Sequence, residues 1–270
     1  MTCLITWIGV DSRGVSSCYI AADSQFSWGQ NGGKWNHGRK VFCSRKSPDI
    51  WGYYGDVFFP STVVSQIIEA LDEGFIESTK ENHSIFESIF KKQFDSYPSA
   101  YESVFGVIHC RRTGTSVRSE YDVTHIKYKP GSGWTSDSLP LPEKSGIVGR
   151  YGSGNRHFKA DLGKITNSDV KGTSRAVFQA FCRMLEKGEA PFVGGAPQLV
   201  SLYRVGNGKQ HGIVWGNEIW LAGMKLAPCD LISTKSLELF NSLFERCDPE
   251  TLERIETAQP QPLPRQLASD

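Results

Sequence analysis

The sequence lacks any long hydrophobic run. No stretch approaches the roughly 20 consecutive apolar residues that a membrane-spanning helix needs. The short apolar run at the N-terminus has no basic leader and contains Trp7 and Gly9. A strand fits this run better than a signal peptide does. We therefore predict a cytoplasmic protein that has no membrane partner.

An excess of charge of one sign is also missing. The 30 Lys and Arg residues balance 29 Asp and Glu residues and leave a formal net charge of +1. This balance disfavours nucleic acid as a partner, because such binding needs a basic surface. The seven cysteines are scattered and never form a Cys-x-x-Cys pair. The sequence therefore predicts no disulfide framework and no metal site, and we expect no cofactor.

The hydrophobic pattern divides the chain into alternating groups of strands and helices. We expect strands at 3–10, 15–22, 40–44 and 49–53, helices from Pro60 and over 84–96, strands at 103–110, 116–128 and 145–148, helices at 155–163 and 169–187, and strands at 198–205, 211–215 and 218–223. Segregated runs of this kind are typical of the α+β class, with sheets covered by helices on their outer faces.

The character of the chain changes after Leu226. Apolar residues at helical spacing follow, and proline-rich sequence begins at Pro260. We predict a main domain over 1–226, a C-terminal helical extension over 227–258 and a disordered tail over 259–270. The amphipathic stripe of the extension consists of Leu237, Phe240, Leu243, Phe244 and Cys247. It would dock on its own domain or on a neighbouring subunit.

The first residues suggest a site. Thr2 follows Met1, and aminopeptidases remove a methionine that precedes a small side chain. A free α-amino group has a pKa of about 7.7–8.0, so it can act as a base near neutral pH. On a threonine it can take the proton of the hydroxyl and make Thr2 a nucleophile without a histidine. The alternative is a Met-Thr start with no chemical role.

Further segments, taken in order, resemble the β subunits of proteasomes and their bacterial relatives. These segments are Thr2, Ala21-Ala22-Asp23-Ser24, Lys40-Val41, Gly52-Tyr53-Tyr54-Gly55-Asp56, Gly152-Ser153-Gly154 and Val193-Gly194-Gly195. The resemblance covers roughly residues 2–225. It implies the four-layer αββα fold of the N-terminal nucleophile hydrolases, which agrees with the expected order of strands and helices.

The resemblance also implies roles for single residues. Thr2 would be the nucleophile, Lys40 would lower the pKa of the terminal amine, and Asp23 would hold Lys40 in place. The N–H of Gly55 would help to form an oxyanion hole, and Ser153 would bind the terminal amine. Gln25 and Gly52 would lie at the groove in which an extended peptide binds.

Each motif also has a structural reading. Asp23-Ser24 could cap a strand, Lys40 could be a solvated residue at a strand start, and Gly152-Ser153-Gly154 could be a simple turn. Two features depart from the family pattern. Thr2 and Asp23 are 21 positions apart, several more than is usual, and Val193 replaces a serine that the family commonly carries.

The leading prediction is a threonine-dependent peptidase that cleaves peptides or unfolded proteins. By resemblance it would form a homo-oligomeric ring, with an ATPase unfoldase as a possible partner. The first alternative is the same fold without catalysis, acting as a scaffold or binding subunit. The second is an N-terminal nucleophile amidase that acts on a small molecule, or an unrelated α+β protein.

Overall fold

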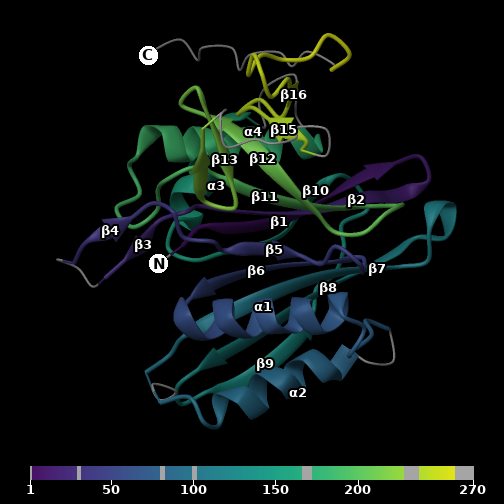
Figure 1. Ribbon diagram of the computed structural model, residues 1–270, viewed down its shortest axis with the longest axis vertical. Helices are drawn as coiled ribbons and strands as arrows, with labels where there is room; N and C mark the ends of the chain where they lie inside the picture. The colour runs from purple at the N-terminus through teal and green to yellow at the C-terminus, as the bar shows by residue number, and fades with distance from the viewer. Residues whose placement is uncertain are drawn as a thin grey trace.

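Two large sheets lie against each other at the centre of the computed structural model (Figure 1), which describes residues 2–28, 32–79, 83–98, 102–165, 172–227 and 237–258. The first sheet has the order β10-β1-β2-β11-β12-β13-β14, and β15 and β16 continue it from β12. Its strands are β1 (Leu4–Asp11), β2 (Gly14–Ala22), β10 (Gly146–Tyr151), β11 (Gln198–Tyr203), β12 (Lys209–Trp215), β13 (Glu218–Leu221), β14 (Met224–Leu226), β15 (Leu239–Phe240) and β16 (Arg246–Cys247).

The second sheet has the order β5-β6-β7-β8-β9. Its strands are β5 (Val41–Cys43), β6 (Asp49–Gly55), β7 (Phe105–Thr113), β8 (Glu120–Lys129) and β9 (Gly133–Ser138). The described helices are α1 (Phe58–Asp72), α2 (His83–Phe94), α3 (Asn155–Ile165) and α4 (Ser174–Lys187), with a short 3-10 turn at Ser116–Arg118. The described chain is therefore a mixed α/β structure with four α-helices.

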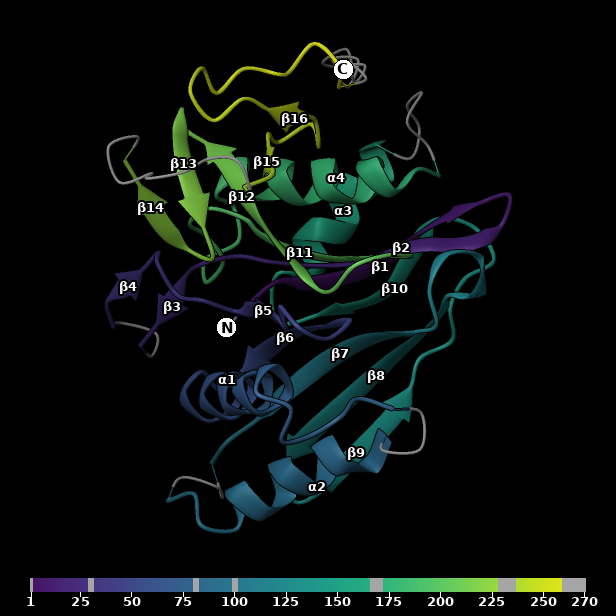
Figure 2. The same cartoon turned by 45° about the vertical axis from the view of Figure 1, so that its right-hand side comes forward.

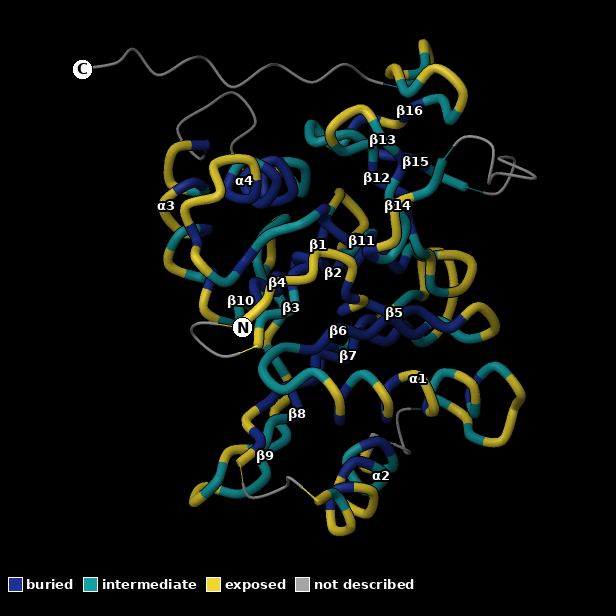
Figure 3. Tube along the Cα trace, turned by 60° about the vertical axis from the view of Figure 1, so that its left-hand side comes forward, coloured by how far each residue is buried: buried dark blue, intermediate teal, exposed yellow. Residues whose placement is uncertain are grey.

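Three apolar clusters hold these elements together. One joins the first sheet to α3 and α4, with Trp7 and Phe178 among its members. A second lies between the two sheets and includes Leu4 and Ile50. A third joins the second sheet to α1 and α2 through residues such as Trp51. Strand β1 is buried over six consecutive residues, because its two faces serve two different clusters. The buried centre of the molecule is visible in Figure 3.

The structure confirms the expected hairpin at the start of the chain and the general placement of all four helices. Helix α4 begins where the hydroxyl of Thr173 accepts a hydrogen bond from the N–H of Ala176, and it ends at Gly188, which has a left-handed φ of 63°. The predicted start at residue 169 lies outside the described residues. The structure also shows a small hairpin that was not expected, formed by β3 (Phe26–Ser27) and β4 (Lys34–Trp35).

The predicted C-terminal helix is wrong for the described residues 237–258. Strand β15 pairs in parallel with β12, and β16 pairs with β15. Phe244 has a φ of 62°, which an α-helix does not allow. The apolar side chains are instead divided between two clusters, with Phe240 packed beside α4 and Leu239 packed on Ile219. Pairing with β12 supplies the backbone hydrogen bonds that a helix would have made locally. The predicted tail at 259–270 lies outside the described residues.

None of the described helices is both long enough and apolar enough to span a membrane.

Candidate active site

Strand directions bring four distant segments to one edge of the structure. Residue Thr2 precedes β1 and Asp23 follows β2, and these strands are antiparallel neighbours in which Leu4 faces Ala22. Leu4 also faces Tyr151, so the turn that contains Gly152 lies beside Thr2. Lys40 precedes β5 of the second sheet, which lies close to the start of the chain in Figure 2. The fold therefore assembles most of the predicted residues, although they are spread over more than half of the chain.

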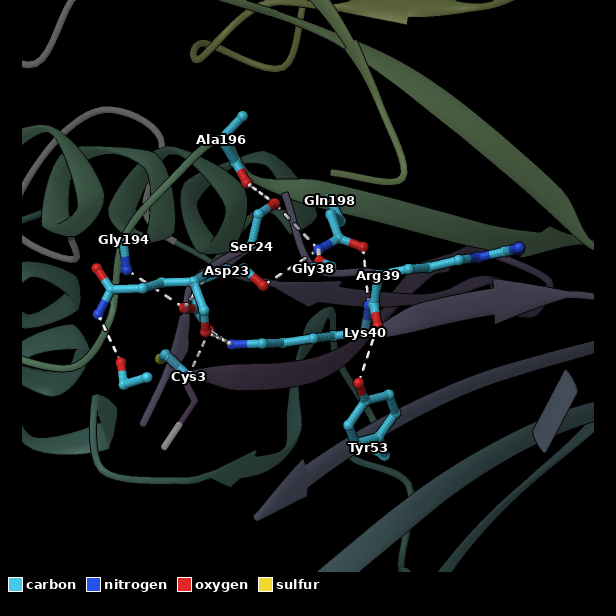
Figure 4. Close-up of polar contacts among 12 residues, drawn as sticks. Cys3, Asp23, Ser24, Gly38, Arg39, Lys40, Tyr53, Gly194, Ala196 and Gln198 are labelled. Carbon is cyan, nitrogen blue, oxygen red and sulfur yellow. Dashed lines mark hydrogen bonds and ion pairs between the residues drawn. The ribbon is translucent and has the colours of Figure 1, made fainter. Parts of the chain in front are cut away.

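A buried ion pair forms the centre of this site (Figure 4). The Nζ atom of Lys40 donates to Asp23 Oδ1 at 2.9 Å and to the carbonyl oxygen of Gln25 at 2.6 Å. Both charged side chains are 0% exposed. The complete burial excludes the alternative in which Lys40 is a solvated residue at a strand start.

The Asp23 carboxylate is also held by three backbone N–H groups. Its Oδ1 atom accepts a hydrogen bond from Cys3 at 2.9 Å, and its Oδ2 atom accepts from Gln25 and Gly194, each at 3.2 Å. Hydrogen bonds to an ionised carboxylate are stronger than neutral ones. These donors come from three segments of the chain, so the carboxylate fixes the segments relative to one another.

Burial changes the proton affinity of two groups at this site. It lowers the pKa of Lys40 from its usual value, and the attraction of Asp23 opposes this change only in part. Burial also raises the pKa of the Cys3 thiol well above its usual range, and the charge of Asp23 adds to this effect. A neutral buried thiol is a poor nucleophile. The lowered pKa shows that the surroundings of Lys40 disfavour its charge.

Thr2 directly precedes Cys3, whose N–H binds Asp23, and it is 1% exposed. Its carbonyl oxygen accepts a hydrogen bond from the N–H of Gly154 at 3.3 Å. Its Oγ1 atom is buried and has no hydrogen-bond partner within the described part of the chain. A buried hydroxyl without a partner is costly. Thr2 therefore carries the kind of unsatisfied polar group that occurs at functional sites.

The turn after β10 can pass Thr2 only because it contains glycine. Gly152 has a φ of 85°, and a Cβ atom built on it would lie 2.0 Å from the carbonyl oxygen of Thr2. A Cβ atom on Gly154 would lie 2.5 Å from that of Cys3. Ser153, between them, is exposed, and its predicted bond to the terminal amine stays a prediction.

The remaining predicted residues fall into different surroundings. Gly55 ends β6 with a φ of 90°, and its predicted contribution to an oxyanion hole is untested. Gln25 is buried, and its Nε2 atom donates to Ser27 Oγ at 3.0 Å. Gly52 lies between the sheets, where an added Cβ atom would be 2.7 Å from side-chain atoms of both Leu4 and Ile20. Core packing therefore explains the glycine at position 52.

Two residues near the site offer contrasting chemistry. Gln198, at the start of β11, makes hydrogen bonds to the backbone of Asp23 and of Lys40. It was not predicted, because no motif or spacing in the sequence marks it. Val193 is buried in the cluster beside α4. Its aliphatic side chain offers no hydrogen bond, at a position where the family that the sequence resembles commonly has a serine.

The described residues contain no group of three or more His, Cys, Asp or Glu side chains that could hold a metal ion. A cavity of about 600 Å³ lies at the opposite end of β1 and β2, with Gly9, Ser17 and Arg175 in its lining. The lining does not include Thr2, Asp23 or Lys40. This cavity is therefore separate from the buried ion pair.

Comparison with known proteins gives only remote similarities. No protein-family model matches this chain, and no curated protein matches it. A solved structure of eukaryotic HslV from Trypanosoma brucei is similar at 15% identity and a TM-score of 0.47, covering 74% of this chain and 99% of that one. A solved structure of an Anbu (Gly-1) mutant from Hyphomicrobium sp. strain MC1 is similar at 15% identity and a TM-score of 0.46, covering 78% of this chain and 87% of that one. Values this low do not assign a family.

Proposed function

We propose that this chain is an N-terminal nucleophile hydrolase of the proteasome β-subunit type, with Thr2 as its nucleophile after removal of Met1. The observation that carries the proposal is the fully buried Asp23–Lys40 pair, whose carboxylate accepts a hydrogen bond from the N–H of Cys3, the residue after Thr2. Buried ion pairs often contribute little to stability, and the lowered pKa of Lys40 shows that burial outweighs the attraction of Asp23. A costly buried ion pair that binds the backbone of Cys3, the residue after Thr2, is better explained by chemistry than by stability.

The proposed chemistry assigns one task to each group. The terminal amine of Thr2 takes the proton of its own hydroxyl, and Oγ1 attacks the carbonyl carbon of a peptide bond. The protonated amine passes that proton to the leaving amine as the C–N bond breaks, and a water molecule then hydrolyses the ester and restores the hydroxyl. The ammonium of Lys40 lowers the pKa of that amine, so that more of it is neutral at pH 7. Asp23 holds Lys40 in place, and the N–H of Gly55 stabilises the developing oxyanion. Ser153 would bind the amine, and Gln25 would border the peptide groove.

The wider proposal follows the sequence resemblance. The arrangement of two sheets between two helix pairs is proposed to be the four-layer αββα sandwich. The proposed substrate is a peptide or unfolded protein, the proposed assembly is a homo-oligomeric ring, and the proposed location is the cytoplasm. An ATPase unfoldase is a further proposed partner.

A catalytically inactive scaffold is the second candidate. Two observations favour it. Lys40 Nζ is directed to Asp23 and to the carbonyl oxygen of Gln25, and Val193 supplies no polar group near the turn at Gly154. In this case the buried pair would only join the two sheets.

The deciding experiment is intact-mass measurement before and after incubation with a peptide epoxyketone, which reacts with a threonine hydroxyl and its free amine together. The proposal expects loss of Met1 and an adduct that maps to Thr2. Retained Met1 without an adduct would leave only the scaffold.

Two variants complete the experiment. Thr2→Val keeps the shape of the side chain and removes the hydroxyl, so it should form no adduct. Cys3→Ser removes the neighbouring thiol, whose raised pKa argues against reactivity, and it should still form the adduct.

A further inference from the structure

Gln198 connects the main chains of both members of the buried ion pair. It is the first residue of β11, faces Ala22 of β2 across the sheet, and is 1% exposed. Its Oε1 atom accepts a hydrogen bond from the N–H of Lys40 at 3.0 Å. Its Nε2 atom donates to the carbonyl oxygen of Asp23 at 3.2 Å. One amide therefore joins the end of β2 in the first sheet to the start of β5 in the second (Figure 4).

The surroundings fix the orientation of this amide. Nε2 also donates to the carbonyl oxygen of Gly38 at 2.7 Å and to Ser24 Oγ at 3.0 Å. The hydroxyl of Ser24 donates its own proton to the carbonyl oxygen of Ala196 at 2.5 Å, so it can only accept from Gln198. If the amide were turned by 180°, its oxygen would face the carbonyl oxygens of Asp23 and Gly38 and the accepting hydroxyl of Ser24. The network therefore permits one orientation, in which Oε1 holds the backbone of Lys40.

This anchor is distinct from the contacts of the Lys40 side chain. The ammonium is bound by Asp23 and by the carbonyl oxygen of Gln25, whereas the backbone N–H is bound by Gln198. We propose that Gln198 is a positioning residue, which fixes the backbone from which Lys40 extends toward Asp23. This inference rests on the proposed function. It adds a residue that does not touch the substrate and acts through Lys40.

The kinetic test is Gln198→Met, which keeps the length of the side chain and removes its hydrogen bonds. A displacement of about 1 Å at a reacting group can reduce a rate about 100-fold, so kcat should fall by about that factor while KM changes little. A Lys40 ammonium that is farther from the terminal amine lowers the pKa of that amine less. The ascending limb of the pH–rate profile should therefore move to higher pH, an effect that weakened packing alone does not produce.

Gln210→Met is the matched control. Gln210 lies on the neighbouring strand β12, and its Nε2 atom donates to the carbonyl oxygen of Leu199 at 3.0 Å, outside the site. This variant should keep the wild-type rate and pH profile. Ser24→Ala is a milder second variant, which removes one partner of Gln198 and should move the profile in the same direction. An unchanged profile in both Gln198→Met and Ser24→Ala would overturn the proposal.

Hydrogen exchange provides a readout that needs no activity. Loss of the Oε1 acceptor should speed exchange of the Lys40 amide in Gln198→Met but not in Gln210→Met. Unchanged exchange would overturn the proposal even in a chain that hydrolyses nothing. Failure of Thr2 to form an adduct, together with faster exchange at Lys40, would instead reject the proposed function and retain Gln198 as the anchor of the ion pair.

Discussion

Substitution of Lys40 by methionine tests how the fold accommodates a fully buried ion pair. The change removes the ammonium and leaves the Asp23 carboxylate buried. Breaking a buried pair on one side typically costs about 3–5 kcal/mol. Asp23 keeps three N–H donors, from Cys3, Gln25 and Gly194. We therefore expect a loss near the lower end of that range, about 3 kcal/mol.

The double variant provides the sharper comparison. Asp23→Asn alone leaves the Lys40 ammonium buried without its counter-ion, and it should also destabilise the chain. Together, Lys40→Met and Asp23→Asn leave no buried charge at the site. The double variant should therefore lose less stability than the sum of the single losses, by about 2 kcal/mol.

Urea denaturation at pH 7 and 25 °C, followed by circular dichroism, gives the free energies of unfolding of the wild type, the two single variants and the double variant. Lys46→Met is the control, because Lys46 pairs with Glu73 at 3.2 Å on the surface, with side chains 63% and 53% exposed. Its loss should cost less than about 1 kcal/mol. Additive losses at Lys40 and Asp23 would refute the coupling through charge, as would a loss at Lys40 no larger than that at Lys46.

Thr2→Val removes a buried hydroxyl that has no hydrogen-bond partner among the described residues. It should therefore raise the free energy of unfolding by about 1 kcal/mol while abolishing any hydrolysis; a clear loss of stability in urea would contradict this. Gly152→Ala places a methyl group against the carbonyl oxygen of Thr2 at a φ of 85°, so thermal denaturation should show a lower Tm. In Gly163→Ala the added methyl group meets no side chain of the described residues within 4 Å, so the Tm should not fall. Burial lowers the pKa of His125 and of His211 to about 4, below an unfolded value of about 6.5. Between pH 4 and pH 6.5 the unfolded chain therefore binds more protons than the folded chain, so the free energy of unfolding falls as the pH drops through this range. At pH 5 each histidine should cost about 2 kcal/mol. Equal urea midpoints at pH 7 and pH 5 would contradict this prediction.

Hydrophobic spacing was sufficient to predict a strand or helix where the element has the same surroundings along its whole length. Strand β1 is apolar on both faces because it separates two clusters, and α1 buries one stripe of side chains that includes Val64 and Leu71. Spacing alone was misleading for the stripe from Leu237 to Cys247. There, pairing of β15 with β12 overrides the helical spacing, and the sequence contains no sign of that pairing.

The sequence by itself provided the chemical candidates, through the hydroxyl of Thr2 and the resemblance to a known family. It also predicted the four helices and most of the strands up to residue 223, because residue type and periodicity are local properties. Thr2, Asp23 and Lys40 could be named from motifs, and antiparallel pairing brings the first two together. Only the tertiary structure showed that Lys40 is fully buried and that Gln198 joins the two sheets. It also showed that Gly52 lies between the sheets, where no side chain would fit. Burial and hydrogen bonding depend on contacts between segments that are distant in the chain, and such contacts exist only after the two sheets have packed.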